Sequence, residues 1–172
     1  MKNLKWNILI CLFTVTLFAS CGYRFEGGGY IKDDVMRIAV HVLENKSSET
    51  GAGIIFTNTL IREITEKTDT KVVDESSATA VLGGTITAIT FSAVARSSSE
   101  TVIDRRISSI VDMKLTRKDD GEVIWSVKRF ATYEDYTVSK DKITDEVSKR
   151  EAVNKIAIRN AEKLVSQMLT NF

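Results

Sequence analysis

Proline is absent from this chain of 172 residues, which contains a single histidine and two cysteines. Without proline, no segment qualifies as a proline-rich tether. Both cysteines, Cys11 and Cys21, lie near the N-terminus, so the rest of the chain has no thiol for a disulfide or for the usual zinc ligand sets. No apolar run after residue 21 approaches the roughly 18 residues that a membrane-spanning helix needs.

Catalytic motifs are missing as well. The sequence has neither the HExxH pattern of zinc hydrolases nor a GxSxG nucleophile turn, and Gly27-Gly28-Gly29 does not match a phosphate-binding loop. The only histidine, His41, lies within an apolar run, where we expect a structural residue that is buried or on an edge strand. We therefore expect a protein that is not an enzyme and that uses no metal and no cofactor.

The N-terminus has the order of an export signal. Lys2 and Lys5 precede an uncharged run, Trp6–Ser20, that ends in small residues. Cys21 follows directly, and this ending resembles the bacterial lipobox, in which the cysteine is acylated and becomes the first mature residue. The alternatives are an ordinary secretory signal and an uncleaved anchor, for which the run is short. We predict an exported lipoprotein with its acyl chains on Cys21.

The charge balance excludes a strongly basic protein. The signal contains two of the 24 basic residues and none of the 23 acidic ones, which leaves 22 against 23 and a net charge of about −1. The mature length favours one domain, large enough to fold without a metal or a disulfide. We predict a signal peptide over residues 1–20, a lipidated N-terminus with a glycine-rich tether over 21–34, and a folded domain over 35–172.

Hydrophobic periodicity predicts the first half of the domain. Val35–Leu43 is mostly apolar and β-branched, as in a strand buried on both faces. A helical stripe follows at Phe56, Leu60 and Ile64 and ends near Lys67. Residues 72–73 form a short extended stub. Residues 80–95 predict a long strand, with a bulge near residues 88–89, where the alternation of apolar residues changes phase.

Two more strands and a second helix complete the pattern. Alternating residues 111–115 connect through the turn Asp119-Asp120-Gly121 to alternating residues 123–127, in a strand that runs to about Tyr133 or Tyr136. An amphipathic helix begins near Thr144, with Ser148 and Glu151 as a capping pair. Its predicted buried stripe consists of Val153, Ile156, Ala157, Asn160, Ala161, Leu164 and Met168.

The order strand, helix, three-strand meander, helix predicts an α+β two-layer sandwich, in which both helices cover the same face of the sheet. The other face would carry Ile110, Ile124 and Phe130 among serine, threonine and lysine side chains. Such a half-polar face is either simply solvated or a surface for a partner, and the pattern leaves both open.

Basic residues gather around one end of this predicted sheet. Those that flank the turn over residues 96–101 or lie along or after the last strand are Arg96, Arg105, Arg106, Lys128, Arg129 and Lys140. In a meander, Arg105, Arg106, Arg129 and Lys140 would share one end, where clustered cations bind phosphates. The alternative is ion pairing with the nearby carboxylates of Glu100, Asp104, Glu134 and Asp135.

Several motifs together resemble one protein family. They are Cys21-Gly22-Tyr23-Arg24-Phe25, Ile38-Ala39-Val40 with Glu44-Asn45, residues 80–86 (AVLGGTI) and residues 121–125 (GEVIW), followed by the closing amphipathic helix. Their order and spacing behind a lipobox resemble LptE, the lipopolysaccharide-assembly lipoproteins of Gram-negative outer membranes. A proline that the family has near the first strand is missing here.

The resemblance implies a mixed four-stranded sheet backed by two helices. It also implies a lipid anchor in the inner leaflet of the outer membrane, on the periplasmic side, which Gly22 fits. LptE-type proteins plug the LptD β-barrel, help it to assemble, and bind lipopolysaccharide during insertion into the outer leaflet. In the family, lipid binding is associated with basic residues near the turn between the second and third strands and shortly after the last strand, so the resemblance implies this role for Arg96 and Lys140. We expect Arg105 and Arg106 to join them.

No nucleic-acid partner is expected, and the only bound group is the covalent lipid on Cys21. A generic periplasmic adaptor lipoprotein of an envelope secretion or cell-wall complex is the alternative function, because small α+β domains also serve there.

Overall fold

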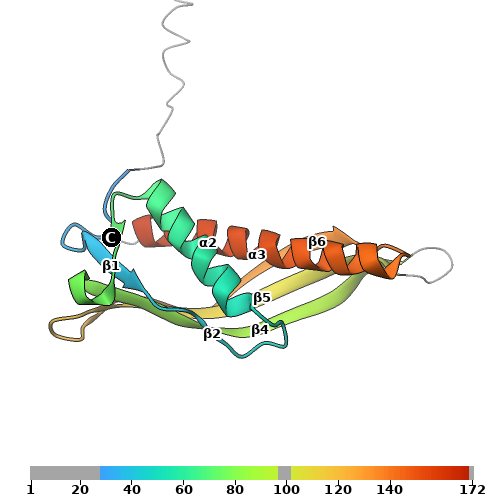
Figure 1. Ribbon diagram of the computed structural model, residues 1–172, viewed down its shortest axis with the longest axis horizontal. Helices are drawn as coiled ribbons and strands as arrows, with labels where there is room; N and C mark the ends of the chain where they lie inside the picture. The colour runs from blue at the N-terminus through green and yellow to red at the C-terminus, as the bar shows by residue number, and fades with distance from the viewer. Residues whose placement is uncertain (1–27, 97–101, 171–172) are drawn as a thin grey trace, which may run out of the picture.

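The computed structural model describes residues 28–96 and 102–170 (Figure 1). Cys21, the predicted signal peptide and residues 97–101 of the predicted turn over residues 96–101 lie outside these ranges. The elements are β1 (Arg37–Val40), β2 (Glu44–Asn45), α2 (Ala52–Lys67), β3 (Lys71–Val72), a 3-10 turn (Glu75–Ser77), β4 (Ala80–Arg96), β5 (Val102–Arg117), β6 (Val123–Thr137) and α3 (Lys142–Thr170).

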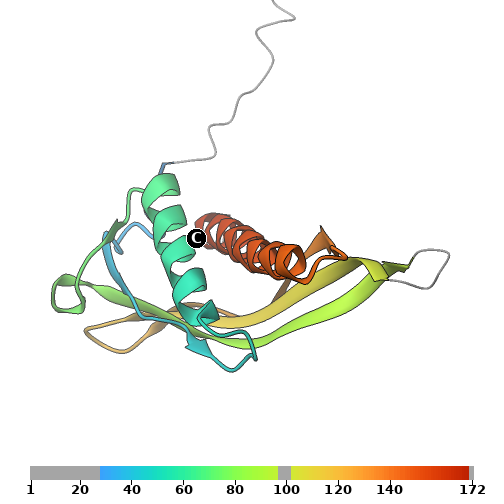
Figure 2. The ribbon, with the colours of Figure 1, turned by 45° about the vertical axis from the view of Figure 1, so that its right-hand side comes forward.

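Both helices lie on the same side of one mixed sheet, so the predicted α+β sandwich is confirmed (Figures 1 and 2). The strand order is β3-β1-β4-β5-β6, and β2 pairs with β4. The pairs that involve β1, β2 and β3 are parallel, whereas β4, β5 and β6 form an antiparallel meander. The sheet therefore has the four predicted strands, the two-residue strand β3 where a short extended stub was predicted, and one additional two-residue strand, β2.

The predicted strand over residues 35–43 is shorter in the structure. β1 ends at Val40, and β2 begins only at Glu44. His41 lies between them and is exposed, with Nε2 3.0 Å from a carboxylate oxygen of Glu75. The prediction of a buried or edge-strand histidine was therefore wrong.

The core lies between the sheet and the helices. All seven residues of the predicted α3 stripe are buried, as are Phe56, Leu60 and Ile64 of α2. They pack on inward side chains such as Leu82 and Leu115, both fully buried. This burial of apolar surface is the main force that holds the layers together. None of the helices over residues 28–96 and 102–170 is long and apolar enough to span a bilayer.

One polar cluster lies inside this core. Ser109 of β5, Thr132 of β6 and Asn160 of α3 are each at most 2% exposed. The two hydroxyl oxygens are 2.8 Å apart, and Asn160 Nδ2 donates to Thr132 Oγ1 at 3.3 Å. Because buried polar groups need partners, these bonds fix where α3 sits on the sheet.

Helix α3 begins earlier than predicted. It starts at Lys142, where the Asp141 carboxylate accepts bonds from the Thr144 backbone N–H (2.9 Å) and hydroxyl (2.7 Å). These bonds hold the pKa of Asp141 below its ordinary value. The predicted capping pair, Ser148 and Glu151, lies inside the helix, so that prediction was wrong.

The folded domain also begins before residue 35. Ile31 is 1% exposed, and its backbone N–H donates to Thr70 Oγ1 at 3.0 Å. Asp34 forms an ion pair with Arg117 at 2.6 Å. The predicted tether over residues 21–34 therefore includes residues that are part of the fold.

Five register shifts interrupt the meander, and two of these β-bulges lie in its central part. The first, at Thr87 between paired residues Ile86 and Ala88, confirms the predicted bulge in the long strand. The second lies in β6, where Lys128 and Arg129 both oppose Asp112, and Arg129 has a φ of 52°. This second bulge changes which residues of β6 face the helices, so Phe130 pairs with Val111 and packs against the core. The prediction that Phe130 lies on the open face was therefore wrong.

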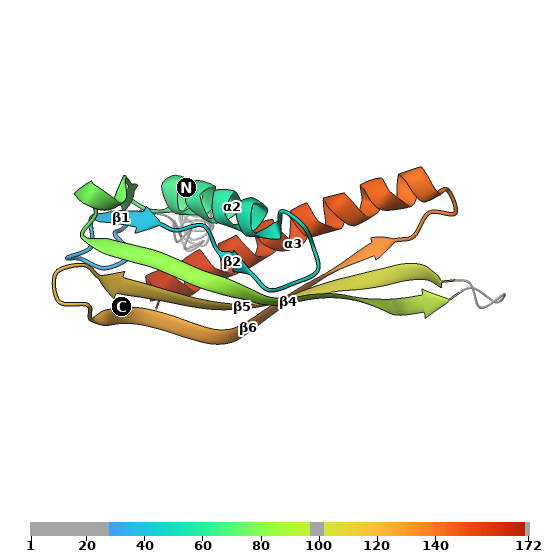
Figure 3. The same cartoon turned by 60° about the horizontal axis from the view of Figure 1, so that its bottom comes forward.

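Past the first bulge, the meander extends beyond the short parallel strands. We call this part the arm: residues 87–96 of β4, 102–110 of β5 and 130–137 of β6. Figure 3 shows it continuing away from β1 and β2, with the N-terminal half of α3 on one side. The described chain starts near the opposite end of the sheet (Figure 1).

Candidate functional site

The strand register brings the four predicted lipid-binding residues to the end of the arm. Arg96 pairs with Val102, Arg105 with Tyr136 and Arg106 with Asp135. Lys140 follows the end of β6 by three residues. The backbones of all four therefore meet at one end, as predicted, although the side chain of Arg96 lies outside the described part.

Arg129 does not belong to this cluster. The second bulge places it opposite Asp112, and its backbone N–H donates to Asp112 Oδ1 at 2.6 Å. It lies in the middle of the sheet, where β6 runs alongside the centre of β5. The expectation that Arg129 would share the end of the arm was therefore wrong.

Arg106 is held by its neighbours on β6. Its Nε and a terminal nitrogen donate to the two oxygens of Asp135 at 2.6 and 2.8 Å, and its guanidinium carbon lies 4.4 Å from the ring centre of Tyr133. The bidentate pair lowers the pKa of Asp135 from its ordinary value of 3.8. The alternative of ion pairing with a nearby carboxylate is thus confirmed for Arg106, whose two bonds to Asp135 use two of its five N–H groups and pair its charge.

Arg105 and Lys140 differ from Arg106. Arg105 lies on the helix side of the sheet, two residues before buried Ile107, and is partly buried, whereas Lys140 is exposed. Within residues 28–96 and 102–170, neither forms an ion pair. Two cations at the end of the arm are therefore available to an anionic ligand.

Aromatic and apolar side chains border these two cations, a feature that the sequence analysis did not identify. The rings of Phe91 and Tyr136 meet edge to face at 6.2 Å, and Lys149 Nζ of α3 lies 4.8 Å from the centre of the Phe91 ring. Nearby, Ile143 is 77% and Val94 49% exposed. Exposed apolar groups beside free cations suit an amphiphile that carries both acyl chains and negative charge.

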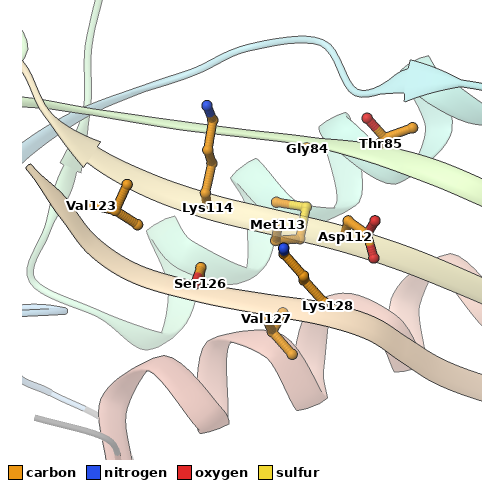
Figure 4. A pocket seen from close by; sticks show the side chains of 9 residues that line it. All are labelled: Gly84, Thr85, Asp112, Met113, Lys114, Val123, Ser126, Val127 and Lys128. Carbon is orange, nitrogen blue, oxygen red and sulfur yellow. The ribbon is translucent and has the colours of Figure 1, made fainter. Parts of the chain in front are cut away.

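A second feature lies on the open face of the sheet. Residues of β4, β5 and β6 line a pocket of about 290 Å³. Figure 4 shows Lys114 and Lys128 extending over this face, while the helices lie behind the sheet. Gly84 lies beneath, and a Cβ there would collide with the Asp112 carbonyl oxygen and with Met113 Sδ. The alternation at Lys114 could have indicated this patch, but the second bulge that positions Lys128 has no clear sequence signal.

The described residues contain no group of three side chains that could hold a metal ion.

Comparisons with solved structures show the same fold. Lipoprotein B from Nitrosomonas europaea is 14% identical with a TM-score of 0.56, over 85% of this chain and 89% of that one. Rare lipoprotein B from Shewanella oneidensis is 15% identical with a TM-score of 0.51, over 77% and 92%. A minor lipoprotein from Acinetobacter baumannii is 12% identical with a TM-score of 0.50, over 80% and 92%.

Sequence comparisons give two further results. No curated protein sequence matches this chain. The family model LptE, described as lipopolysaccharide-assembly, matches residues 35–168, which is more than half of the chain and nearly all of the described domain.

Proposed function

Because this chain belongs to the LptE lipopolysaccharide-assembly family, we propose that it is the lipid-anchored subunit of an outer-membrane lipopolysaccharide translocon. In this role it plugs an LptD-type β-barrel, helps the barrel to assemble, and binds lipopolysaccharide during its insertion into the outer leaflet. It works without catalysis, metal or cofactor. The family match over residues 35–168 carries the proposal.

The lipid anchor is the first part of the mechanism. Acyl chains on Cys21 would hold the domain at the periplasmic face of the outer membrane, since each buried CH₂ contributes about 0.8 kcal/mol. The described chain begins near one end of the sheet and the arm extends toward the other (Figure 1). An anchored molecule can therefore direct the arm away from its tether.

Lipopolysaccharide binding is assigned to the end of the arm. Arg105 and Lys140, which form no ion pair with a described residue, would contact the phosphates, and Arg96 contributes a third charge. Val94 and Ile143 would contact acyl chains. Arg106, whose charge is paired with that of Asp135, would contribute less to phosphate binding than Arg105 or Lys140.

The experiment is purification of the tagged full chain from detergent-solubilised envelopes, followed by identification of what comes with it. Recovery of a large outer-membrane β-barrel and of lipopolysaccharide supports the proposal. Recovery only with inner-membrane or cell-wall synthases contradicts it and favours the adaptor alternative.

A charge-reversal pair tests the assignment to the arm. Arg105→Glu with Lys140→Glu should weaken lipopolysaccharide binding about tenfold or more, because charge-assisted bonds to phosphate are lost. Lys155→Glu with Lys163→Glu changes the net charge equally on the exposed side of α3 and is the control. Equal affinities of the two double variants for lipopolysaccharide at low salt would show that the binding site does not lie at the end of the arm.

A further inference from the structure

One edge of the arm is a free strand edge. β2 pairs with β4 only as far as Ile86, whose carbonyl oxygen also accepts the Lys46 N–H at 2.9 Å. From Thr87 to Arg96, the only described strand that pairs with β4 is β5. At about 3.3 Å per residue, this free edge is roughly 33 Å long.

The free edge exposes backbone hydrogen-bonding groups at known positions. The carbonyl groups of Leu82 and Ile86 point to this side, where they accept the N–H groups of His41 and Lys46. Both side chains face the helices. In a strand, side-chain direction and N–H direction alternate together, so Ile89, Phe91 and Ala93, which face the same way after the bulge, also direct their N–H and C=O groups outward.

Between Ala88 and Ala93 the free edge of β4 is regular, and its register shifts lie at its two ends, at Thr87 and at residues 94–96. The other edges of the sheet have protection along their length. β6 is interrupted by the bulge at Lys128 and Arg129, and Arg159 donates to the Tyr133 carbonyl oxygen at 3.1 Å. β3 is only two residues long. Bulges, charged residues and short length are the usual devices that stop a strand from pairing with another chain.

The amino-acid composition of the free edge favours pairing with another strand. Residues 87–95 (TAITFSAVA) contain no charged residue, and most have high β-propensity. Exposed apolar residues lie at both ends of the free edge. Val42 and Ile54, near β2, are 67% and 60% exposed, and Val94, near the end of the arm, is 49% exposed. An undefended edge of this kind is a binding surface or an aggregation hazard.

We propose that Ala88–Ala93 of β4 binds an extended, uncharged segment of the barrel partner, which adds to the sheet as a further strand. This inference rests on the proposed function. A second copy of this chain is a poorer occupant. Antiparallel pairing of two β4 edges turns one molecule end for end, whereas two chains anchored by Cys21 in one membrane point the same way.

A proline at Ala93 tests the proposal. Ala93 is exposed, and its N–H points outward, so Ala93→Pro removes one edge donor and keeps the bonds between β4 and β5. Ala93→Thr keeps the N–H and is the matched control. We expect Ala93→Pro to lower recovery of the barrel with the full chain about tenfold, and Ala93→Thr to leave it within about twofold.

Backbone amide exchange in the wild-type complex provides a second measurement that needs no variant. Strand addition should slow exchange at Ile89, Phe91 and Ala93 on complex formation, while Thr90 and Ser92, already bonded to β5, change little. Uniform protection or none at these five residues overturns the proposal, even if Ala93→Pro fails to fold.

The outcomes separate this inference from the proposed function. Equal barrel recovery with Ala93→Pro and Ala93→Thr, both folded by circular dichroism, overturns the added strand and leaves the proposed function standing. If no barrel co-purifies with the wild-type chain, the result contradicts the proposed function itself. If Ala93→Pro abolishes self-association of the purified chain and leaves barrel recovery unchanged, the occupant is a second copy and the proposal is wrong.

Discussion

The buried polar cluster of Ser109, Thr132 and Asn160 makes a quantitative prediction about stability. Thr132→Val keeps the shape of the side chain and removes the hydroxyl that both neighbours contact, at 2.8 and 3.3 Å. Each buried group that loses its partner costs about 1–3 kcal/mol. Since the 3.3 Å bond from Asn160 is long, we expect a total loss of about 2 kcal/mol in the free energy of unfolding.

Urea unfolding followed by the fluorescence of Trp125 measures this loss, because Trp125 is only 6% exposed in the fold. With a slope of about 2 kcal/mol per molar urea, the midpoint should fall by about 1 M. Thr90→Val, at an exposed position on the open face, is the control and should change stability by less than about 0.5 kcal/mol.

Removing the whole cluster separates hydrogen bonding from packing. The triple variant Ser109→Ala, Thr132→Val, Asn160→Leu leaves no polar side-chain atom unpaired, so we expect it to recover most of the stability that Thr132→Val loses. A Thr132→Val protein as stable as the wild type, or a triple variant far less stable than the single one, would refute this account of how α3 is positioned.

Three further predictions concern separate parts of the molecule. Gly84→Ala should destabilise the domain by about 1–3 kcal/mol, measured by thermal unfolding, because the new Cβ collides with Met113. Asp135 has a lowered pKa in the fold through its bonds to Arg106, so its stabilising effect is complete above pH 3.8 and is lost as the pH falls through the lower folded value. Asp135→Asn should therefore flatten the acid side of the stability profile, and an unchanged profile would contradict the pair. Cys21→Ala should abolish acylation, and mature protein that still carries acyl chains by mass spectrometry would exclude Cys21 as the site.

The apolar pattern predicted the layers because burial depends on periodicity alone. The stripes of α2 and α3 and the inward residues of β4 and β5 all appear in the core where the pattern placed them. The start of α3, predicted near Thr144 and observed at Lys142, does not follow from the apolar stripe. Its first turns lie along the arm, where Ile143 is 77% exposed, so the apolar stripe begins about ten residues after the helix does.

Contacts between distant strands explain the remaining differences. The bulge at Arg129 depends on the Asp112 carboxylate, 17 residues away, and nothing in the alternation of β6 indicates that bond. Phe130 was assigned to the wrong face for this reason. The short parallel strand β2, which was not predicted, likewise depends on its pairing with β4 rather than on its own two residues.

For the candidate site, the sequence predicted which basic residues lie near the end of the β5–β6 hairpin. It did not predict which of them form ion pairs within the protein. The turn at Gly121, where φ is 74°, joins β5 and β6 in a hairpin whose far end brings Arg105 near Lys140, although two register shifts along the hairpin change the exact pairing. Which arginine forms an ion pair depends on the face of the sheet on which it lies. Arg106 lies directly opposite Asp135 on the open face, whereas Arg105 lies on the helix side.

Depletion of this protein in its own cells tests the central claim most directly. The measurement is the amount of newly made lipopolysaccharide that reaches the cell surface while the protein is withdrawn. A subunit of the translocon predicts that surface lipopolysaccharide falls in step with the protein while its synthesis continues. Unchanged surface delivery after the protein has gone would contradict the account.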